Sequence, residues 1–281
     1  MTEPAQQPSP ASERYGERIF SHLSPEETDR LDALAQALDP RTFRRFEQLP
    51  MRDNWHCLEI GAGLGTTAHW LAARCTAGRV VATDIDTRLF PTADARNGWQ
   101  GLEHDVTQDD FPEGSFDLIH LRWVLSHLRG RDEVLPRVVR WLAPGGWLLV
   151  EDLARFPLES SPNPLYRKVS LAMCDAAAER IGTDFFWARN LSAPLRAAGL
   201  VHVDMEASAE SVGPGPMGRF WQLTAEQLAS DLHRTSDVTP CDLDRFLAEI
   251  RSEEFSDLCL GTVAAWGQRS EGVGPKTAPA R

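Results

Sequence analysis

The stretch Cys57-Leu58-Glu59-Ile60-Gly61-Ala62-Gly63-Leu64-Gly65-Thr66 decides the fold of this chain. The apolar run that opens it is typical of a buried strand in a parallel sheet, and a helical pattern begins where it ends. Three glycines at alternate positions separate the two. A Cβ at Gly61 or Gly63 would fill space that a tight turn and an approaching ligand need. The helix start that follows offers unpaired N–H groups.

The spacing of these glycines distinguishes between kinds of nucleotide-binding loop. The dinucleotide fingerprint G-x-G-x-x-G requires a glycine at position 66, where this chain has Thr66. A Walker loop requires G-K-[S/T], which does not follow, and the chain holds only two lysines, Lys168 and Lys276. The remaining pattern, E-x-G-x-G-x-G with Glu59 as its acid, resembles motif I of the class I S-adenosylmethionine (SAM) dependent methyltransferases.

Further landmarks of this family follow in order. The apolar run 79–84 ends in Asp84, about 20 residues beyond the turn, where adenosine-binding folds place a carboxylate for the ribose. Residues 102–106 resemble the third motif, in which Asp105 receives the adenine amino group and Val106 packs on the ring. Residues 115–121 predict strand four, and the Pro-Gly-Gly turn within 142–152 leads into strand five.

The resemblance implies a doubly wound, seven-stranded and mostly parallel α/β sheet with a helical N-terminal arm and helical lid insertions. It also implies SAM as the cofactor and S-adenosylhomocysteine as the product. The expected cofactor-binding residues are Glu59, Gly61, Ala62, Gly63, Gly65, Asp84, Ile85, Asp105, Val106, Arg122 and Tyr15.

Composition limits the class of protein. With 281 residues, 42% hydrophobic and 25% charged, the chain is typical of a soluble globular protein. A formal net charge of −12 disfavours long runs of phosphate contacts, so no nucleic-acid partner is expected. No apolar run reaches the roughly 20 residues that span a bilayer, and the N-terminus lacks a signal-like apolar core. We therefore expect a cytoplasmic protein with no membrane partner. The oligomeric state stays open, with a homodimer as one option.

The five cysteines are scattered and form no C-x-x-C pair or Cys/His cluster. Buried thiols, rather than disulfides or a metal site, are the expectation.

The chain divides into segments by its patterning. Residues 1–12 predict a disordered tail, 13–50 a helical arm, 51–268 the SAM-binding domain and 269–281 a flexible tail. Within the domain, strand six is expected at 200–205 and an antiparallel last strand at 260–266. The segments 153–186 and 207–256 interrupt the alternation of strands and helices, and we expect them to cover the acceptor pocket.

Several side chains are candidates for the chemistry. Tyr15 is expected to close over the methionine part of SAM or simply to pack on the core. Arg122 either lines the cofactor site through its backbone or holds an acidic substrate. His127 is a candidate general base or a structural histidine, because its unperturbed pKa of about 6.5 suits proton removal near neutrality. Glu151, at the end of strand five, is a second candidate base or a binding or capping residue; successive strand side chains alternate, so only Glu151 or Asp152 can face the crevice.

Aromatic residues of the cover segments predict an enclosed acceptor pocket. The expected pocket residues are Trp123, Phe186, Trp187 and Trp221, with Phe185 and Phe220 nearby; the alternative is that these aromatic residues form the core of the cover itself. Such a pocket suits a small organic acceptor better than a folded protein or a duplex.

The sequence thus predicts methyl transfer from SAM to an O, N or C nucleophile of a small organic acceptor, a secondary metabolite. Three alternatives remain: a SAM-binding regulator without turnover, an NAD(P)-dependent oxidoreductase, and RNA or protein methylation.

Overall fold

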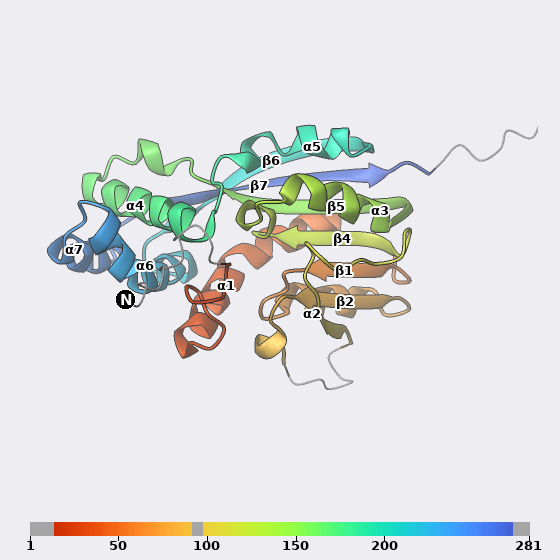
Figure 1. The fold of residues 1–281 in the computed structure, drawn as a ribbon, viewed down its shortest axis with the longest axis horizontal. Helices are drawn as coiled ribbons and strands as arrows, with labels where there is room; N and C mark the ends of the chain where they lie inside the picture. Colours follow the sequence, from red (N-terminus) through yellow and green to blue (C-terminus); the bar gives the residue numbers. More distant parts are fainter. Residues whose placement is uncertain (1–13, 92–97, 272–281) are drawn as a thin grey trace, which may run out of the picture.

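The computed structural model describes residues 14–91 and 98–271, and its centre is a single seven-stranded sheet (Figure 1). The predicted tail at 1–12 lies outside the described residues, as does 272–281. In sequence order the strands are β1 (His56–Ile60), β2 (Arg79–Asp84), β3 (Gln100–Glu103), β4 (Phe116–Arg122), β5 (Leu142–Ala154), β6 (Leu200–Val212) and β7 (Asp257–Arg269).

The strand order is β3-β2-β1-β4-β5-β7-β6, and β7 runs antiparallel to both of its neighbours while the other pairs are parallel. This confirms the predicted fold. The last two strands are longer than the sequence suggested. Their pairing runs from Leu200 opposite Arg269 to Val212 opposite Asp257, so strand six continues well past Met205.

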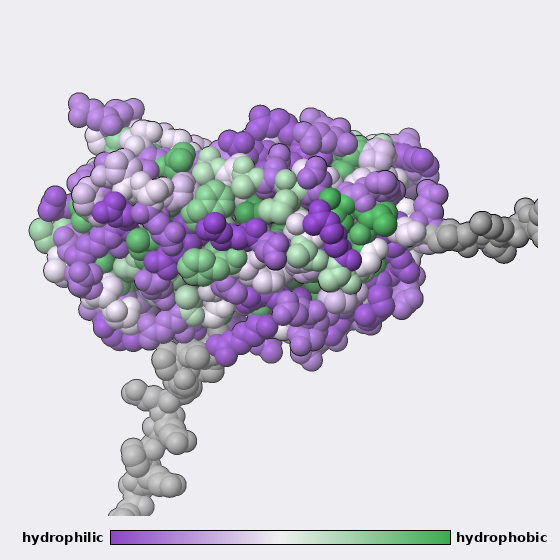
Figure 2. Space-filling model, turned by 90° about the horizontal axis from the view of Figure 1, so that it is seen from above, coloured by the Kyte–Doolittle hydropathy of each residue, from purple (hydrophilic) through white to green (hydrophobic). Residues whose placement is uncertain are grey.

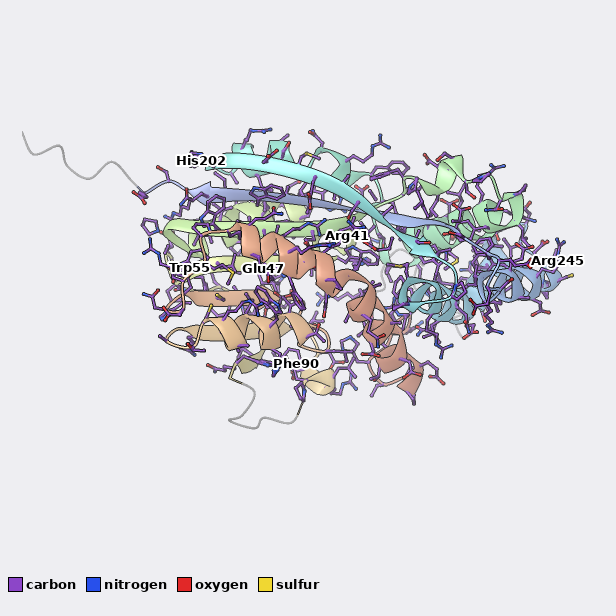
Figure 3. The ribbon with its side chains drawn as sticks, turned by 180° about the vertical axis from the view of Figure 1, so that it is seen from behind. Arg41, Glu47, Trp55, Phe90, His202 and Arg245 are labelled. Carbon is purple, nitrogen blue, oxygen red and sulfur yellow. The ribbon has the colours of Figure 1, made fainter. Side chains whose placement is uncertain are left out.

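Helices cover both faces of the sheet. They are α1 (Pro25–Gln48), α2 (Thr66–Arg74), α3 (Arg131–Trp141), α4 (Pro164–Ile181), α5 (Ser192–Ala197), α6 (Pro216–Thr235) and α7 (Pro240–Ile250). Figure 1 shows α3 and α5 in front of the sheet, and Figure 3 shows α1 and α2 across the opposite face. Short 3₁₀ turns span Thr87–Leu89, Leu125–His127, Leu158–Ser160 and Trp187–Asn190.

A separate group of helices, α4, α6 and α7, stands beyond the ends of the strands (Figure 1). It has its own hydrophobic core, whose members include Tyr166, Met173, Trp221 and Phe246. The parallel strands end on this side of the sheet, and ligand crevices of open α/β sheets lie at the carboxyl ends of the strands. The helical group therefore lies over the carboxyl ends of the strands, and residues 207–212 of the second expected cover segment belong to β6.

The outer strand β6 presents a mainly polar edge. Figure 2 views the molecule from this side and shows hydrophilic side chains interspersed with smaller hydrophobic patches. Arg41 of α1 pairs with Glu210, and Arg45 pairs with Glu206 at 2.6 Å, so α1 reaches the underside of β6. Charged side chains on an edge strand disfavour pairing with another sheet.

A buried polar network fastens α1 to the middle of the sheet. Arg45 Nη1 donates to Glu151 Oε1 at 2.7 Å, and Thr42 Oγ1 donates to the other carboxylate oxygen at 2.5 Å. His120 bonds through Nδ1 to Glu59 Oε2 at 2.7 Å, while its Nε2 lies 3.7 Å from Glu151 Oε2. All five side chains are buried. Buried charged side chains thus connect α1 to the three strands β1, β4 and β5.

The network sets the charge states of its members. Burial by itself lowers the pKa of His120, but Glu59 and Glu151 outweigh burial and raise it to about 9. Burial by itself raises the pKa of Glu151, but His120 and Arg45 hold it at about 2. Both groups are therefore charged at neutral pH, and each depends on its partners.

Removing one member should leave an uncompensated buried charge. We expect Arg45→Met to lower the free energy of unfolding by about 3–5 kcal/mol, measured by urea denaturation. Arg44→Met is the matched control, because Arg44 lies one residue earlier on α1 and is exposed. Equal losses in the two variants would contradict a special role for the network.

The raised pKa of His120 also predicts a pH dependence. A group whose pKa is higher in the folded state contributes stability that is complete below its unfolded pKa of about 6.5 and is lost as pH rises through about 9. The unfolding free energy should therefore decline by up to about 3 kcal/mol between pH 6 and 9.5. His120→Gln should remove this decline, whereas His56→Gln, at an exposed histidine, should keep it. A flat profile in the unaltered protein would refute the assignment.

Candidate functional site

A cavity of about 850 Å³ opens at the carboxyl ends of the strands. We call one part the strand-end half; it is lined by the glycine turn and the ends of β2, β3 and β4. We call the other part the helical half. Its lining residues are Tyr15, Phe20, Arg30, Leu31, Leu34, Trp123, His127, Met173, Cys174, Ala177, Ile181, Phe185, Phe220, Trp221, Thr224, Leu228 and Leu260. The volume lies in the range of about 300–1,000 Å³ found for small-molecule sites.

The glycine turn lines the strand-end half through Gly61, Ala62 and Gly63. Gly61 has φ +69°, and a Cβ there would lie 2.4 Å from Val124 Cγ2. Gly63 has φ +54°, and a Cβ there would find its nearest neighbour, Leu31 Cδ1, at 3.9 Å. The first glycine therefore permits packing against the loop after β4, and the second leaves the cavity open beside the backbone.

Asp84 stands at the end of β2 with its carboxylate held toward the turn. Its Oδ2 accepts from Gly63 N at 2.9 Å and its Oδ1 from Asp86 N at 3.2 Å. Burial raises its pKa, against the effect of these two bonds. Ile85 and Asp86 continue the wall, and Ile85 is about half exposed beside the opening. A carboxylate in this position can accept hydrogen bonds from a diol.

Asp105 and Val106 line the far end of the strand-end half. Asp105 Oδ1 accepts from Thr107 N and Oγ1 at 2.9 and 2.6 Å, and its Oδ2 lies 3.3 Å from Arg14 Nη1. The last contact joins the N-terminal arm to this end of the cavity. The arm therefore lies across the strand-end half.

Arg122 and Trp123 form the boundary between the halves. The Arg122 guanidinium turns away to α1, where it bonds to Asp39 at 2.7 Å and to Thr42 at 3.0 Å, so it does not offer a free cation to a ligand. Trp123 has φ +54°, a left-handed backbone that is rare for a bulky residue. Its indole N–H donates to Thr262 Oγ1 at 3.3 Å. This strained residue faces both halves.

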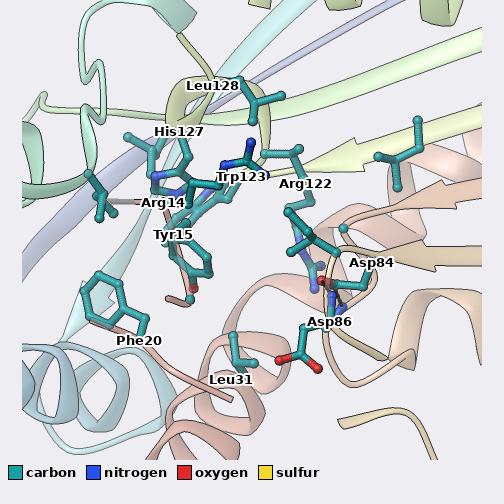
Figure 4. Close-up of a pocket in the computed structure, with 18 of the residues that line it drawn as sticks. Arg14, Tyr15, Phe20, Leu31, Asp84, Asp86, Arg122, Trp123, His127 and Leu128 are labelled. Carbon is teal, nitrogen blue, oxygen red and sulfur yellow. Dashed lines mark hydrogen bonds between the residues drawn. The ribbon is translucent and has the colours of Figure 1, made fainter. Parts of the chain in front are cut away.

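His127 and Tyr15 lie together at the same boundary (Figure 4). Their ring centroids are 4.8 Å apart, and His127 Nδ1 shares a hydrogen bond with Thr183 Oγ1 at 2.9 Å. Burial, aided by the charges of Arg30 and Arg131, lowers the pKa of His127 to about 3. The imidazole is therefore neutral at physiological pH, with one nitrogen as donor and the other as acceptor.

Most of the expected cofactor residues line the cavity, but two do not. Glu59 is directed into the buried network with His120, and Gly65 lies behind the turn, where a Cβ would meet the Trp99 ring at 2.7 Å. Glu151, the second candidate base, is also away from the cavity. Its carboxylate is fully committed to Arg45 and Thr42 beneath the sheet, so it cannot reach a substrate.

The aromatic wall differs from the expected one at two positions. Trp123 and Trp221 line the cavity, as do the nearby Phe185 and Phe220, but Phe186 and Trp187 do not. Asp184 Oδ1 accepts from the backbone N–H groups of Phe186 and Trp187 at 2.9 and 3.0 Å, which turns the chain after Phe185. Phe186 is consequently 56% exposed.

A buried ion pair in the arm was missed by the sequence analysis. Arg30 lines the helical half, and Glu27 lies behind it with no exposed surface. The signal was present in the spacing: Arg30 follows Glu27 by three residues and precedes Leu34 by four, so all three lie on the apolar face of α1. Charged residues on the buried face of a helix need partners inside the protein.

Two further features are absent from residues 14–91 and 98–271. No cluster of three or more His, Cys, Asp or Glu side chains suited to a metal ion occurs there. In the same part of the chain, none of the helices combines the length and apolar character required to cross a membrane.

Residues 58–150 match the model of the family described as "Methyltransferase domain". Methyltransferase str3 of Strobilurus tenacellus is 34% identical over 128 residues, which cover 45% of this chain and 46% of that protein. Methyltransferase GfsG of Streptomyces halstedii is 31% identical over 130 residues, covering 44% and 46%. The chain spans about half the length of the curated relatives it matches.

Among solved structures, phosphoethanolamine N-methyltransferase 2 of Haemonchus contortus, in complex with phosphomonomethylethanolamine and S-adenosylhomocysteine, has a TM-score of 0.58 and 16% identity. The match covers 90% of this chain and 60% of that one. At this identity the likeness shows a shared fold.

The two glycines of the turn predict different costs of substitution. Gly61→Ala should lower the free energy of unfolding by about 3 kcal/mol, because strain at positive φ adds to the collision with Val124. Gly63→Ala should cost about 1 kcal/mol, from strain alone. Urea unfolding of both variants measures the difference, and equal costs would contradict the packing described for Gly61.

Proposed function

Because residues 58–150 form a class I SAM-dependent methyltransferase domain, we propose that the protein binds SAM in the strand-end half of the cavity and methylates a small organic acceptor in the helical half. The observation that carries this proposal is the continuity of the two halves. Tyr15, Trp123 and His127 border one cavity in which a cofactor and an acceptor can meet.

The strand-end half suits an adenosine cofactor. Asp84 accepts hydrogen bonds from both ribose hydroxyls, and the open space beside Gly63 admits the amino-acid part of SAM against the backbone. Ile85 and Val106 offer apolar surfaces to the adenine ring, and Asp105 accepts from its amino group.

SAM supplies an electrophilic methyl group on a sulfonium centre when it is bound. The protein aligns the nucleophile with that group, and alignment provides most of the catalysis in such a transfer. The aromatic rings of Tyr15 and Trp123 favour a nearby positive charge through their π faces. The apolar walls of the helical half exclude water from the reaction.

His127 contributes as a neutral hydrogen-bonding group in this proposal. Since its pKa is lowered to about 3, it holds a proton weakly at neutral pH and is better suited to orienting an acceptor than to storing its proton. A separate general base is required only for a nucleophile that stays protonated at neutral pH.

We further propose that the acceptor is a secondary metabolite, methylated on O, N or C. The support is the aromatic and aliphatic wall that α4, α6 and the arm contribute to the cavity. The acidic net charge of −12 is consistent with a partner other than nucleic acid.

Calorimetric titration with SAM, and separately with NADH, tests the cofactor. We expect a SAM dissociation constant in the micromolar range, about −8 kcal/mol, and no heat with NADH. Asp84→Ala should weaken SAM binding by about tenfold or more, because the ribose loses its acceptor. Asp132→Asn, at an exposed aspartate outside this cavity, is the control and should bind as the unaltered protein does.

A folded protein that binds NADH, or that does not bind SAM, would overturn the proposal. If SAM binds, S-adenosylhomocysteine formation over a panel of acceptors distinguishes an enzyme from a SAM-binding regulator.

A further inference from the structure

Among the residues that the structure describes, Arg30 is the buried cation in the wall of the helical half, and a carboxylate already neutralises it. Arg30 Nε donates to Glu27 Oε2 at 2.7 Å, and Arg30 Nη2 donates to Glu27 Oε1 at 2.6 Å. Their side chains are 4% and 0% exposed. This two-pronged pairing cancels both charges inside the wall.

Neighbouring groups complete the pair and shield it. Gln227 Nε2 of α6 donates to Glu27 Oε2 at 3.1 Å. The Arg30 guanidinium carbon lies 4.1 Å from the centroid of the Phe20 ring and 5.2 Å from that of Phe220. Two aromatic faces therefore pack against the cation and add cation–π stabilisation to the neutralised pair.

Tyr15 provides a polar contact to this half of the cavity, beside the neutral imidazole of His127. Its hydroxyl accepts from Arg30 Nη2 at 2.6 Å, and within residues 14–91 and 98–271 this is the one hydrogen bond that the structure gives it. A phenol that accepts one bond still has a proton to donate. Burial raises the pKa of Tyr15, so the hydroxyl keeps that proton.

The other walls add little polarity. Met173, Ala177, Ile181 and Phe185 are apolar. The indole N–H of Trp221 is taken by Ser170 Oγ at 2.9 Å, and the Thr224 hydroxyl by a backbone carbonyl at 2.8 Å. Arg14 and Arg129, which also border the cavity, are exposed to solvent.

We propose that the acceptor is an uncharged, mainly apolar molecule with one oxygen that accepts a hydrogen bond from Tyr15, and that Glu27 enforces this choice by cancelling Arg30. The inference rests on the proposed function for the role of the helical half. A carboxylate or phosphate placed there would lose its water without gaining an available cation, which is costly. Phosphorylated amines, such as the one in the Haemonchus complex, are therefore excluded as acceptors.

The test uses two probes of nearly the same shape, 2-naphthol and 6-hydroxy-2-naphthoate, together with phosphoethanolamine. Each is titrated calorimetrically into protein saturated with S-adenosylhomocysteine at pH 7. We expect 2-naphthol to bind at least about tenfold more tightly than the carboxylate, and phosphoethanolamine not to bind at millimolar concentration. Tyr15→Phe should weaken 2-naphthol binding by about tenfold.

Glu27→Gln should shift the ratio of the two affinities by about tenfold or more toward 6-hydroxy-2-naphthoate, because Arg30 then faces the cavity unpaired. Glu26→Gln is the matched control, since Glu26 is the exposed neighbour on the same turn and should leave the ratio unchanged. If Glu27→Gln does not fold, the double variant Glu27→Gln/Arg30→Met removes both charges and should retain the preference for 2-naphthol.

Tight binding of the carboxylate or of phosphoethanolamine to the unaltered protein would overturn this inference. The same holds if neither naphthyl probe binds, or if Glu27→Gln leaves the ratio of affinities unchanged. These results are distinct from failure of the proposed function, in which the protein does not bind SAM or S-adenosylhomocysteine at all.

Discussion

The structure depends on the contact between Arg45 and Glu151 beneath the sheet. It joins α1 to the charged group formed by Glu59 and His120, so one helix is held against three strands through buried ions. Such ions are costly to bury and strongly destabilising when one is removed. Because the geometry must satisfy every member, α1 has one position on the sheet. A purely apolar contact would allow the helix to slide.

The position of α1 on the sheet determines which of its side chains form the cavity wall. The C-terminal half of α1 lies in the network, while its N-terminal half carries Arg30, Leu31 and Leu34 into the cavity wall. Glu59, the acid next to the glycine turn, thus acts on the site through the sheet and the helix. It holds the wall in place without touching the ligand space.

The sequence predicted the sheet and the strand-end half well because both rest on local patterns. Strand, glycine turn and acid recur at fixed spacing, so Gly61, Asp84 and Asp105 could be placed without coordinates. The prediction of Glu151 as a base was wrong, since the alternation of side chains along a strand does not show which of two neighbours faces the crevice. The prediction of Phe186 as a pocket residue was wrong because the Asp184 carboxylate accepts a hydrogen bond from its backbone N–H and turns the chain. The Glu27–Arg30 pair depends on where α1 docks, which only long-range packing decides.

The two halves of the cavity come from different parts of the chain. The glycine turn and the strand ends lie within residues 58–150, while most of the helical half comes from the arm, α4 and α6, outside that range. Changes in the covering helices can therefore alter which molecule is admitted without moving a single backbone atom of the turn. The strand-end half is accordingly fixed by the sheet, whereas the helical half can vary with the helices that cover it.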